Sequence, residues 1–217
     1  MPFNRQKYLQ PSVLCDFNQS PAVQMNAQEL VAGCKNRQQK FESIFRFVKE
    51  LPYGLEDWDL KASETLKKGW GMCSGKTNLL VALLRSVGIP ARYRIYRIKS
   101  DMALWSRLGN MSSNTARMSE LGEERDHVDC EVWLGKWVDC DPGRDSTMEK
   151  GLLKLGGTLE RRKVADTKGK VHYIRLANYD DWVRERQRRR AFRADRADVF
   201  ADANKGFEAI RKLGKSS

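Results

Sequence analysis

The stretch from residue 73 to residue 90, "CSGKTNLLVALLRSVGIP", places the strongest constraint on the fold of this chain. Leucine, valine and alanine cover most of its surface at helical spacing, so the sequence predicts a helix that is buried on nearly all sides. Gly88 and Pro90 supply the expected end of that helix. A buried helix needs other elements packed around it, so the chain must fold with this segment at its centre.

The segments around this helix indicate an α+β fold. Apolar residues recur at helical spacing between residues 21 and 50. "ARYRIYRI" alternates and predicts a strand, while "HVDCEVWL" and "WVDCDP" predict an antiparallel hairpin. "KVHYIRL" predicts one more strand, and residues 179–213 are expected to be helical. The expected architecture is N-terminal helices, one buried central helix packed on an antiparallel sheet, and a basic C-terminal helix.

Composition narrows the class of protein. The chain has 217 residues, which suits one domain, and its five cysteines are sparse and odd in number, as is typical of reduced thiols. It shows no apolar run of membrane-span length and no apolar signal region, so a cytoplasmic protein without membrane contact is expected.

The formal net charge is +12, and much of it lies near the C-terminus. That region forms either a solvated helix face or a contact for an acidic partner or nucleic acid. The arginines concerned are Arg184, Arg186, Arg188, Arg189, Arg190 and Arg193.

Gly75-Lys76-Thr77 resembles the end of a phosphate-binding loop, but two requirements of that loop are not met. The motif needs four residues between its first glycine and the Gly-Lys pair, whereas Gly69 and Gly71 leave five and three. It also needs an apolar strand before the loop, and the preceding "KASETLKKG" is polar. The sequence therefore argues against phosphate binding here.

Cys73 lies in the first turn of the predicted central helix, where nucleophilic chemistry is feasible. Free backbone N–H groups and the helix dipole stabilise an anion at a helix N-terminus, so they lower the pKa of a thiol there. The same N–H groups can hold the oxyanion of an acyl-transfer intermediate. The alternative is a buried, inert cysteine. A cysteine nucleophile needs a histidine base, and the chain has only His127 and His172.

The turn of the hairpin decides whether His127 can meet a carboxylate. With a two-residue turn, Asp141 falls opposite Cys130 and faces away from His127. With a three-residue loop, Asp141 pairs with Asp129 and becomes a diagonal neighbour of His127 on one face. A catalytic pair therefore predicts a three-residue loop or a bulge, and Gly135 would allow either.

Taken together, these segments resemble the transglutaminase-like superfamily. A Gly-x-Cys at a helix start, an "LLR-x-x-GIPAR" helix exit, a His-led strand and an Asp-Pro after a Trp-led return strand occur here in that order. The upstream "FESIFRFVKELPYG" is similar to the helix that enters this core in bacterial members. The likeness covers about residues 20–150, and it implies a papain-like, transglutaminase-like core.

The resemblance implies Cys73 as the nucleophile, His127 as the base and Asp141 as the carboxylate that orients the imidazole. Family members often carry an aromatic residue two positions after the histidine, where this chain has Asp129. Asp129 is then either a second acidic neighbour of His127 or a residue on the wall of the cleft. Trp70 either shapes the substrate channel or packs in the core. The remaining oxyanion, cleft and carboxylate candidates are Ser74, Asp139 and Asp145.

The activity that this family implies is acyl transfer at an amide through a cysteine thioester. We expect hydrolysis of a peptide or protein amide, with protein-glutamine cross-linking or deamidation as the alternative. A catalytically silent domain that binds RNA or an acidic partner through its basic segment is the second alternative. No cofactor, calcium or other metal is expected; zinc held by His127, Cys130 and Cys140, with Cys73 nearby, is disfavoured because Cys130 should face the core.

The expected organisation is one transglutaminase-like domain over residues 1–177, with its core at 37–150, and an Arg-rich helical tail over 178–217. Residues 100–126 lack a clear periodicity and separate the first predicted strand from His127. They form either a lid over the cleft or a plain surface loop.

Overall fold

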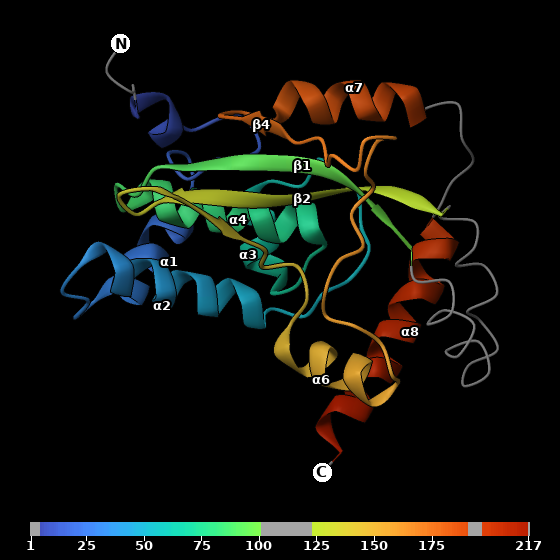
Figure 1. Cartoon of the computed structure of the whole chain (residues 1–217). Coiled ribbons are helices and arrows are strands. Elements are labelled where there is room, and N and C mark those ends of the chain that lie inside the picture. Colours follow the sequence, from blue (N-terminus) through green and yellow to red (C-terminus); the bar gives the residue numbers. More distant parts are fainter. Residues whose placement is uncertain (1–4, 101–122, 191–196, 217) are drawn as a thin grey trace.

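The computed structural model describes residues 5–100, 123–190 and 197–216, and a four-stranded antiparallel sheet lies at its centre. The strands follow the order β3-β2-β1-β4, so the two long strands lie in the middle (Figure 1). The expected antiparallel sheet in an α+β fold is thereby confirmed. The strands are β1 (Ala91–Lys99), β2 (Glu124–Trp133), β3 (Trp137–Cys140) and β4 (Ile174–Leu176).

Helices pack on the sheet and extend beyond one end of it. Figure 1 shows α1 to α4 together on one side of the sheet, with α6 and α8 side by side farther along the molecule. Within the described ranges, no helix is both long and apolar enough to cross a bilayer. The helices are the 3-10 turn η1 (Gln6–Leu9), α1 (Pro21–Val31), α2 (Arg37–Glu50), α3 (Ala62–Lys68), α4 (Cys73–Ser86), α6 (Ser146–Lys154), α7 (Asp180–Arg190) and α8 (Ala197–Lys215).

The expected burial of the central helix is confirmed, since every residue of α4 from Cys73 to Arg85 is buried. Several of its polar side chains form hydrogen bonds with the surrounding segments. Asn78 Nδ2 donates to the carbonyl oxygens of Leu14 (2.6 Å) and Leu60 (3.1 Å), and its Oδ1 accepts from the Tyr93 hydroxyl (2.8 Å). Such pairing is what allows a helix with polar residues to lie inside a core.

Gly75 belongs to the packing of α4 rather than to a phosphate site. A Cβ atom at this position would lie 2.5 Å from Glu56 Oε1 and 2.8 Å from Thr65 Oγ1. The Glu56 carboxylate in turn accepts a hydrogen bond from the backbone N–H of Met72, the N-cap residue of α4, at 3.0 Å. Glycine is needed here because a side chain would push this carboxylate away from the helix N-terminus.

Lys76 is fully buried and ties three segments together. Its ammonium donates to the carbonyl oxygens of Lys49 (3.0 Å), Leu51 (2.6 Å) and Gly143 (3.0 Å). The first two carbonyls lie at the end of α2, and the third lies in the loop that follows β3. Burial lowers the pKa of Lys76 to about 7, so these bonds only partly offset the loss of water around the charge.

Replacing Lys76 by Met is expected to lower the free energy of unfolding by about 2–3 kcal/mol, because three buried carbonyl oxygens lose their donor. The midpoint of urea unfolding measures this change. Lys67→Met is the matched control, since Lys67 is exposed on α3 and should change stability by less than about 0.5 kcal/mol. Equal effects of the two substitutions would contradict this role of Lys76.

The segment 178–217 is helical in its described parts, and its apolar side chains join the same core as the rest of the chain. Trp182 of α7 contacts Trp58, with ring centroids 5.2 Å apart. Phe207 of α8 contacts Tyr53 edge to face, also at 5.2 Å. These two contacts bring α7 and α8 to the end of α4 that carries Cys73.

The last residues of the expected insertion at 100–126 belong to strand β2. β2 begins at Glu124, because the ladder with β1 continues as far as the pair Lys99 and Glu124. Residues 101–122 lie outside the described residues, so the choice between a lid and a plain surface loop stays open. The strand expected in "KVHYIRL" is shorter than its sequence pattern, since only Ile174–Leu176 pairs with β1.

Candidate active site

The β2–β3 hairpin has the three-residue loop that a catalytic pair requires. Trp133 pairs with Trp137, which leaves three residues between them, and Gly135 in this loop has a φ of +93°. The register places Asp141, just beyond β3, on the same face of the sheet as His127. The expected three-residue loop is confirmed, and with it the diagonal placement of these two residues.

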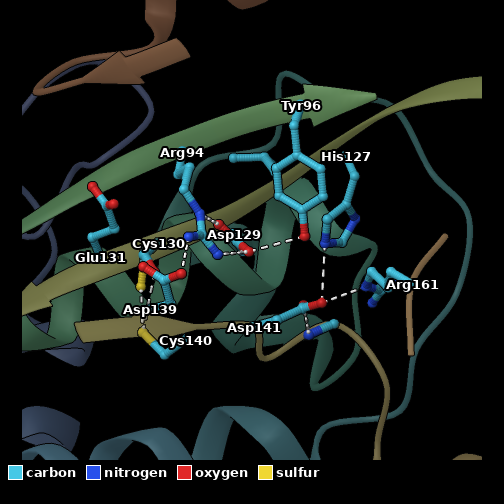
Figure 2. A network of polar contacts seen from close by, with 12 residues as sticks. Arg94, Tyr96, His127, Asp129, Cys130, Glu131, Asp139, Cys140, Asp141 and Arg161 are labelled. Atoms are coloured by element: carbon cyan, nitrogen blue, oxygen red, sulfur yellow. Dashed lines mark hydrogen bonds and ion pairs between the residues drawn. The ribbon is translucent and has the colours of Figure 1, made fainter. Parts of the chain in front are cut away.

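His127 links a carboxylate on one side to a thiol on the other. Its Nε2 lies 3.1 Å from Asp141 Oδ2 (Figure 2). Cys73, the first residue of α4, lines the same cavity as His127, and its interaction with the imidazole contributes to the raised pKa of His127. His127 and Cys73 are nearly buried, with 2% and 4% of their surfaces exposed. The structure thus brings together the three residues that the family resemblance singled out.

The surroundings of this pair favour a charged thiolate and a charged imidazolium. Burial raises the pKa of the Cys73 thiol, but hydrogen bonds from His127 and from the backbone of Val128, with the charge of His127, lower it below its usual range. Burial and the charge of Arg161 lower the pKa of His127, yet the charge and hydrogen bond of Asp141 outweigh them and raise it. Both net shifts stabilise the ion pair over the neutral pair.

Asp141 is held in its ionised form. Burial alone would raise the pKa of this carboxyl group, but the charges of Arg161 and His127 hold it well below its usual range. Arg161 Nε donates to the same Oδ2 that faces His127, and the backbone N–H of Gly143 donates to Oδ1 at 2.8 Å. A carboxylate with both oxygens engaged has little freedom to rotate.

Asp129 lies in a buried ion pair and not on an open cleft wall, and one of its carboxylate oxygens lies within 4.8 Å of an imidazole nitrogen of His127. It is 1% exposed and faces Arg94 directly across the β1–β2 ladder. Arg94 Nε and Nη2 donate to its two oxygens at 2.8 and 2.7 Å, and the Tyr96 hydroxyl donates at 3.1 Å (Figure 2). Tyr96 also packs edge to face on His127, with ring centroids 5.2 Å apart. Asp129 therefore supports the imidazole through Tyr96.

The donor groups at this site do not suit a metal ion. His127, Asp129 and Asp141 each offer one ligand atom, and these atoms lie within 4.8 Å of one another. However, guanidinium groups from Arg94 and Arg161 already neutralise the two carboxylates. A cation placed among them would meet two positive charges and would have to displace their hydrogen bonds.

The cysteine pair of the hairpin lies apart from the imidazole. Cys130 and Cys140 are directly opposite in the ladder, both are buried, and their Sγ atoms are 2.9 Å apart. They lie on the core face of the β2–β3 hairpin, whereas His127 lies on the other face. The expectation that Cys130 points into the core is confirmed, so the disfavoured zinc set does not assemble.

The other candidate residues from the sequence are packed, buried or paired within the fold. Trp70 packs against Gly54 and under the Lys68 ammonium, and it is not among the described residues on the cavity wall. Ser74 is fully buried, and its hydroxyl has no hydrogen-bond partner in the described part of the chain. The two alternative carboxylates are also occupied: Asp139 pairs with Arg94, and Asp145 caps α6 and pairs with Arg211.

His172 has an acidic partner that local sequence did not reveal. Its Nε2 lies 2.7 Å from Asp166 Oδ2 on the surface. The bridge between Ala165 and Val171 brings these two side chains together across a turn. No hydrogen bond or ion pair links this second His–Asp pair to Cys73 in the described ranges.

A cavity of about 660 Å³ opens beside Cys73 and His127. Its wall includes the ends of β1 and β2, the segment 158–162, and side chains of α6, α7 and α8. Sequence reasoning missed the basic residues of this wall, among them Arg125 and Arg161. Arg125 could have been found from its position two residues before His127 on one strand, whereas Arg161 lies in an irregular segment without such a signal.

Three arginines of α7 form ion pairs with acidic residues of this chain. Arg184 pairs with Asp181 (2.8 Å), and Arg189 pairs with Glu185 (3.0 Å). Arg186 pairs with Asp126 (2.9 Å) and stacks on Trp58. Arg188 is exposed; Arg193 and the side chain of Arg190 lie outside the described residues. Binding of RNA or an acidic partner by these arginines stays a prediction.

Comparisons with known proteins agree with this architecture. The profile of the transglutaminase-like superfamily matches residues 24–142. Among solved structures, a presumed cysteine protease from Cytophaga hutchinsonii is 17% identical, with a TM-score of 0.47 over 81% of this chain and 56% of that one. Red sea bream transglutaminase is 14% identical, with a TM-score of 0.35 over 84% of this chain and 41% of that one. The chain thus spans about half the length of these two proteins, and no curated protein matches it.

The family match covers more than half of the chain and runs from α1 to just beyond β3. Cys73, His127 and Asp141 all lie within it. This protein belongs to the transglutaminase-like superfamily.

Proposed function

We propose that this protein is a cysteine hydrolase that cleaves a peptide or protein amide through a thioester on Cys73. The observation that supports this most strongly is the Cys73–His127–Asp141 arrangement at the N-terminus of a buried helix. His127 Nε2 lies 3.1 Å from Asp141, and the shifts of pKa favour a thiolate beside an imidazolium. These are the features that a cysteine nucleophile with a histidine base and an orienting carboxylate requires.

In the acylation step, the Cys73 thiolate attacks the carbonyl carbon of the amide and forms a tetrahedral intermediate. Free backbone N–H groups in the first turn of α4 are suited to hold its oxyanion. The His127 imidazolium then donates its proton to the departing amine, the C–N bond breaks, and a thioester remains. Asp141 stays ionised throughout and keeps the imidazole in the required orientation.

In the second step, neutral His127 takes a proton from water, which attacks the thioester and releases the acid. The cavity wall carries charged Arg, Glu and Asp side chains, which favour a hydrated site and so support water over an amine as the acceptor. Amine transfer would require a site that excludes water from the thioester. Hydrolysis is therefore the proposed outcome, and aminolysis is the competing one.

The first test is the rate of Cys73 alkylation by iodoacetamide as a function of pH, in wild type, His127→Ala and Asp141→Ala. In wild type the thiolate persists below the pKa of about 8.5 of a free cysteine, so alkylation should stay fast below that pH. Without His127, burial of the thiol prevails, and the profile should move above that value. Asp141→Ala should give an intermediate profile, since the histidine remains but loses its counter-charge.

A wild-type profile centred at or above the free-cysteine value, and unchanged in His127→Ala, would overturn the proposal. Once a substrate peptide is found, mass spectrometry of the product formed with an added primary amine separates the two outcomes. A free acid supports hydrolysis, whereas an amide of the added amine supports acyl transfer.

A further inference from the structure

The cavity beside Cys73 has a cationic wall that the proposed chemistry does not use. Beside the thiol, this wall carries the guanidinium groups of Arg125, Arg144 and Arg161. Arg125 lies on the same face of β2 as His127, two residues before it, because side chains alternate along a strand. The thiol and these positive charges therefore face the same cavity.

All three charges act on Tyr53, which lines the same cavity. Burial and the Cys73 thiol raise the pKa of Tyr53, whereas Arg125, Arg161 and Arg144 all act in the opposite direction. The arginines also act on one another, since burial and the charge of Arg161 lower the pKa of Arg144 to about 10. Tyr53, the Cys73 thiol and the three arginines all line this one cavity.

Two of the three guanidinium groups have no carboxylate partner within the described ranges. Arg125 Nε is buried there without a hydrogen-bond acceptor. Arg144 Nη1 donates only to the backbone carbonyls of Thr158 and Leu159, each at 3.2 Å. Arg161 alone has an acidic partner, which is the orienting carboxylate of the catalytic site.

The acidic residues of the cavity wall do not compensate these charges. Glu160 is exposed. The others are paired elsewhere: Glu124 with Arg97 (3.2 Å), Asp126 with Arg186 (2.9 Å) and Glu185 with Arg189 (3.0 Å). Among the described residues, the cavity beside Cys73 therefore keeps an excess of positive charge.

A buried cation without a counter-charge is costly, and a carboxylate that binds a guanidinium through charge-assisted hydrogen bonds removes that cost. We infer that this wall binds a carboxylate of the substrate, so that the preferred acyl donor is an acidic peptide amide. Its carboxylate would lie within a few bonds of the scissile carbonyl. The inference rests on the proposed function, because it names the substrate class for the same thiol.

The test compares two alkylating reagents of nearly equal size, iodoacetate, which carries a carboxylate, and neutral iodoacetamide. The ratio of their rates at Cys73 is measured by peptide mass spectrometry and divided by the same ratio for N-acetylcysteine. Both reagents attack the same thiolate, so the thiolate fraction cancels. The normalised ratio should exceed one in wild type and fall by about tenfold in Arg125→Gln, the effect of one lost charge-assisted hydrogen bond.

Matched variants keep this test independent of folding and of total charge. Arg184→Gln removes the same charge from an exposed site outside the cavity wall and should leave the ratio unchanged. Arg125→Lys keeps the charge and should retain most of the preference, and Arg144→Gln should lower it again. A wild-type ratio at or below one, or equal ratios in Arg125→Gln, Arg144→Gln and Arg184→Gln, would overturn the inference.

Failure of the proposed function gives a different result from failure of this inference. A thiol that titrates normally and ignores His127 would refute the catalytic pair, while the reagent ratio would still report on the charge of the wall. For a turnover assay, two peptide amides that differ only by Glu or Gln beside the scissile bond are compared. A kcat/KM ratio in favour of Glu that Arg125→Gln removes supports the inference, and equal values for the two peptides contradict it.

Discussion

Replacing Asp141 by Asn is expected to lower kcat for amide hydrolysis by about 10³- to 10⁴-fold while the protein stays folded. In wild type, Asp141 Oδ2 accepts from both His127 Nε2 and Arg161 Nε, and Oδ1 accepts from the backbone N–H of Gly143. An Asn side chain has one acceptor oxygen and one NH₂ group that can only donate, and the oxygen is needed to accept from the backbone N–H of Gly143. Its NH₂ group would then face two donors, and the imidazole would turn or change its tautomer.

A changed tautomer places a proton on the ring nitrogen that must accept one from Cys73. The loss should therefore appear in kcat, with a raised thiol pKa in the alkylation profile. The chain offers a matched control in its other His–Asp pair, since Asp166→Asn alters the exposed partner of His172. That variant should keep wild-type kcat. A loss of less than tenfold in Asp141→Asn, or an equal loss in both variants, would show that Asp141 does not orient the base.

Replacing Arg94 by Met is expected to lower the free energy of unfolding by about 3–5 kcal/mol, because it leaves the buried Asp129 carboxylate without its counter-charge. The side chains of Arg94 and Asp129 are only 6% and 1% exposed, and Arg94 also pairs with Asp139. The measurement is the midpoint of urea unfolding. Arg97→Met on the same strand is the control, since the pair of Arg97 with Glu124 is exposed and should contribute less than about 1 kcal/mol.

The pH dependence of the Arg94→Met variant provides a second check. Burial raises the pKa of Asp129, and Arg94 opposes that rise, so removing Arg94 should raise it further. A carboxyl group whose pKa is higher in the folded than in the unfolded protein binds more protons when folded. It therefore lowers the free energy of unfolding by an amount that grows as the pH rises from the unfolded pKa to the folded pKa. The deficit should therefore shrink as the pH falls from about 7 to about 5. The double variant Arg94→Met with Asp129→Leu should recover part of the stability, and a pH-independent deficit would contradict this account.

The position of Cys73 and the shape of the hairpin follow from local sequence. A run of apolar residues at helical spacing cannot be accommodated at a surface, so α4 had to be buried, and Cys73 had to lie at its N-terminus. The alternation of "HVDCEVWL" assigns His127 and Cys130 to opposite faces of a strand, as the structure shows. The loop length was an open choice between two registers, and only one of them let His127 meet Asp141.

The partners of the buried charges depended on the arrangement of strands that are far apart in sequence. Arg94 and Asp129 face each other because β1 and β2 pair in one register, which no local pattern in either strand specifies. Arg161 reaches Asp141 from an irregular segment, where there is no periodicity to predict the direction of a side chain. Local sequence therefore determined the helices and strands and the place of Cys73 at the start of α4, because backbone hydrogen bonding and apolar periodicity act over a few residues. The tertiary structure alone decided which charges compensate one another, because electrostatic pairing depends on distances that only the packed chain sets.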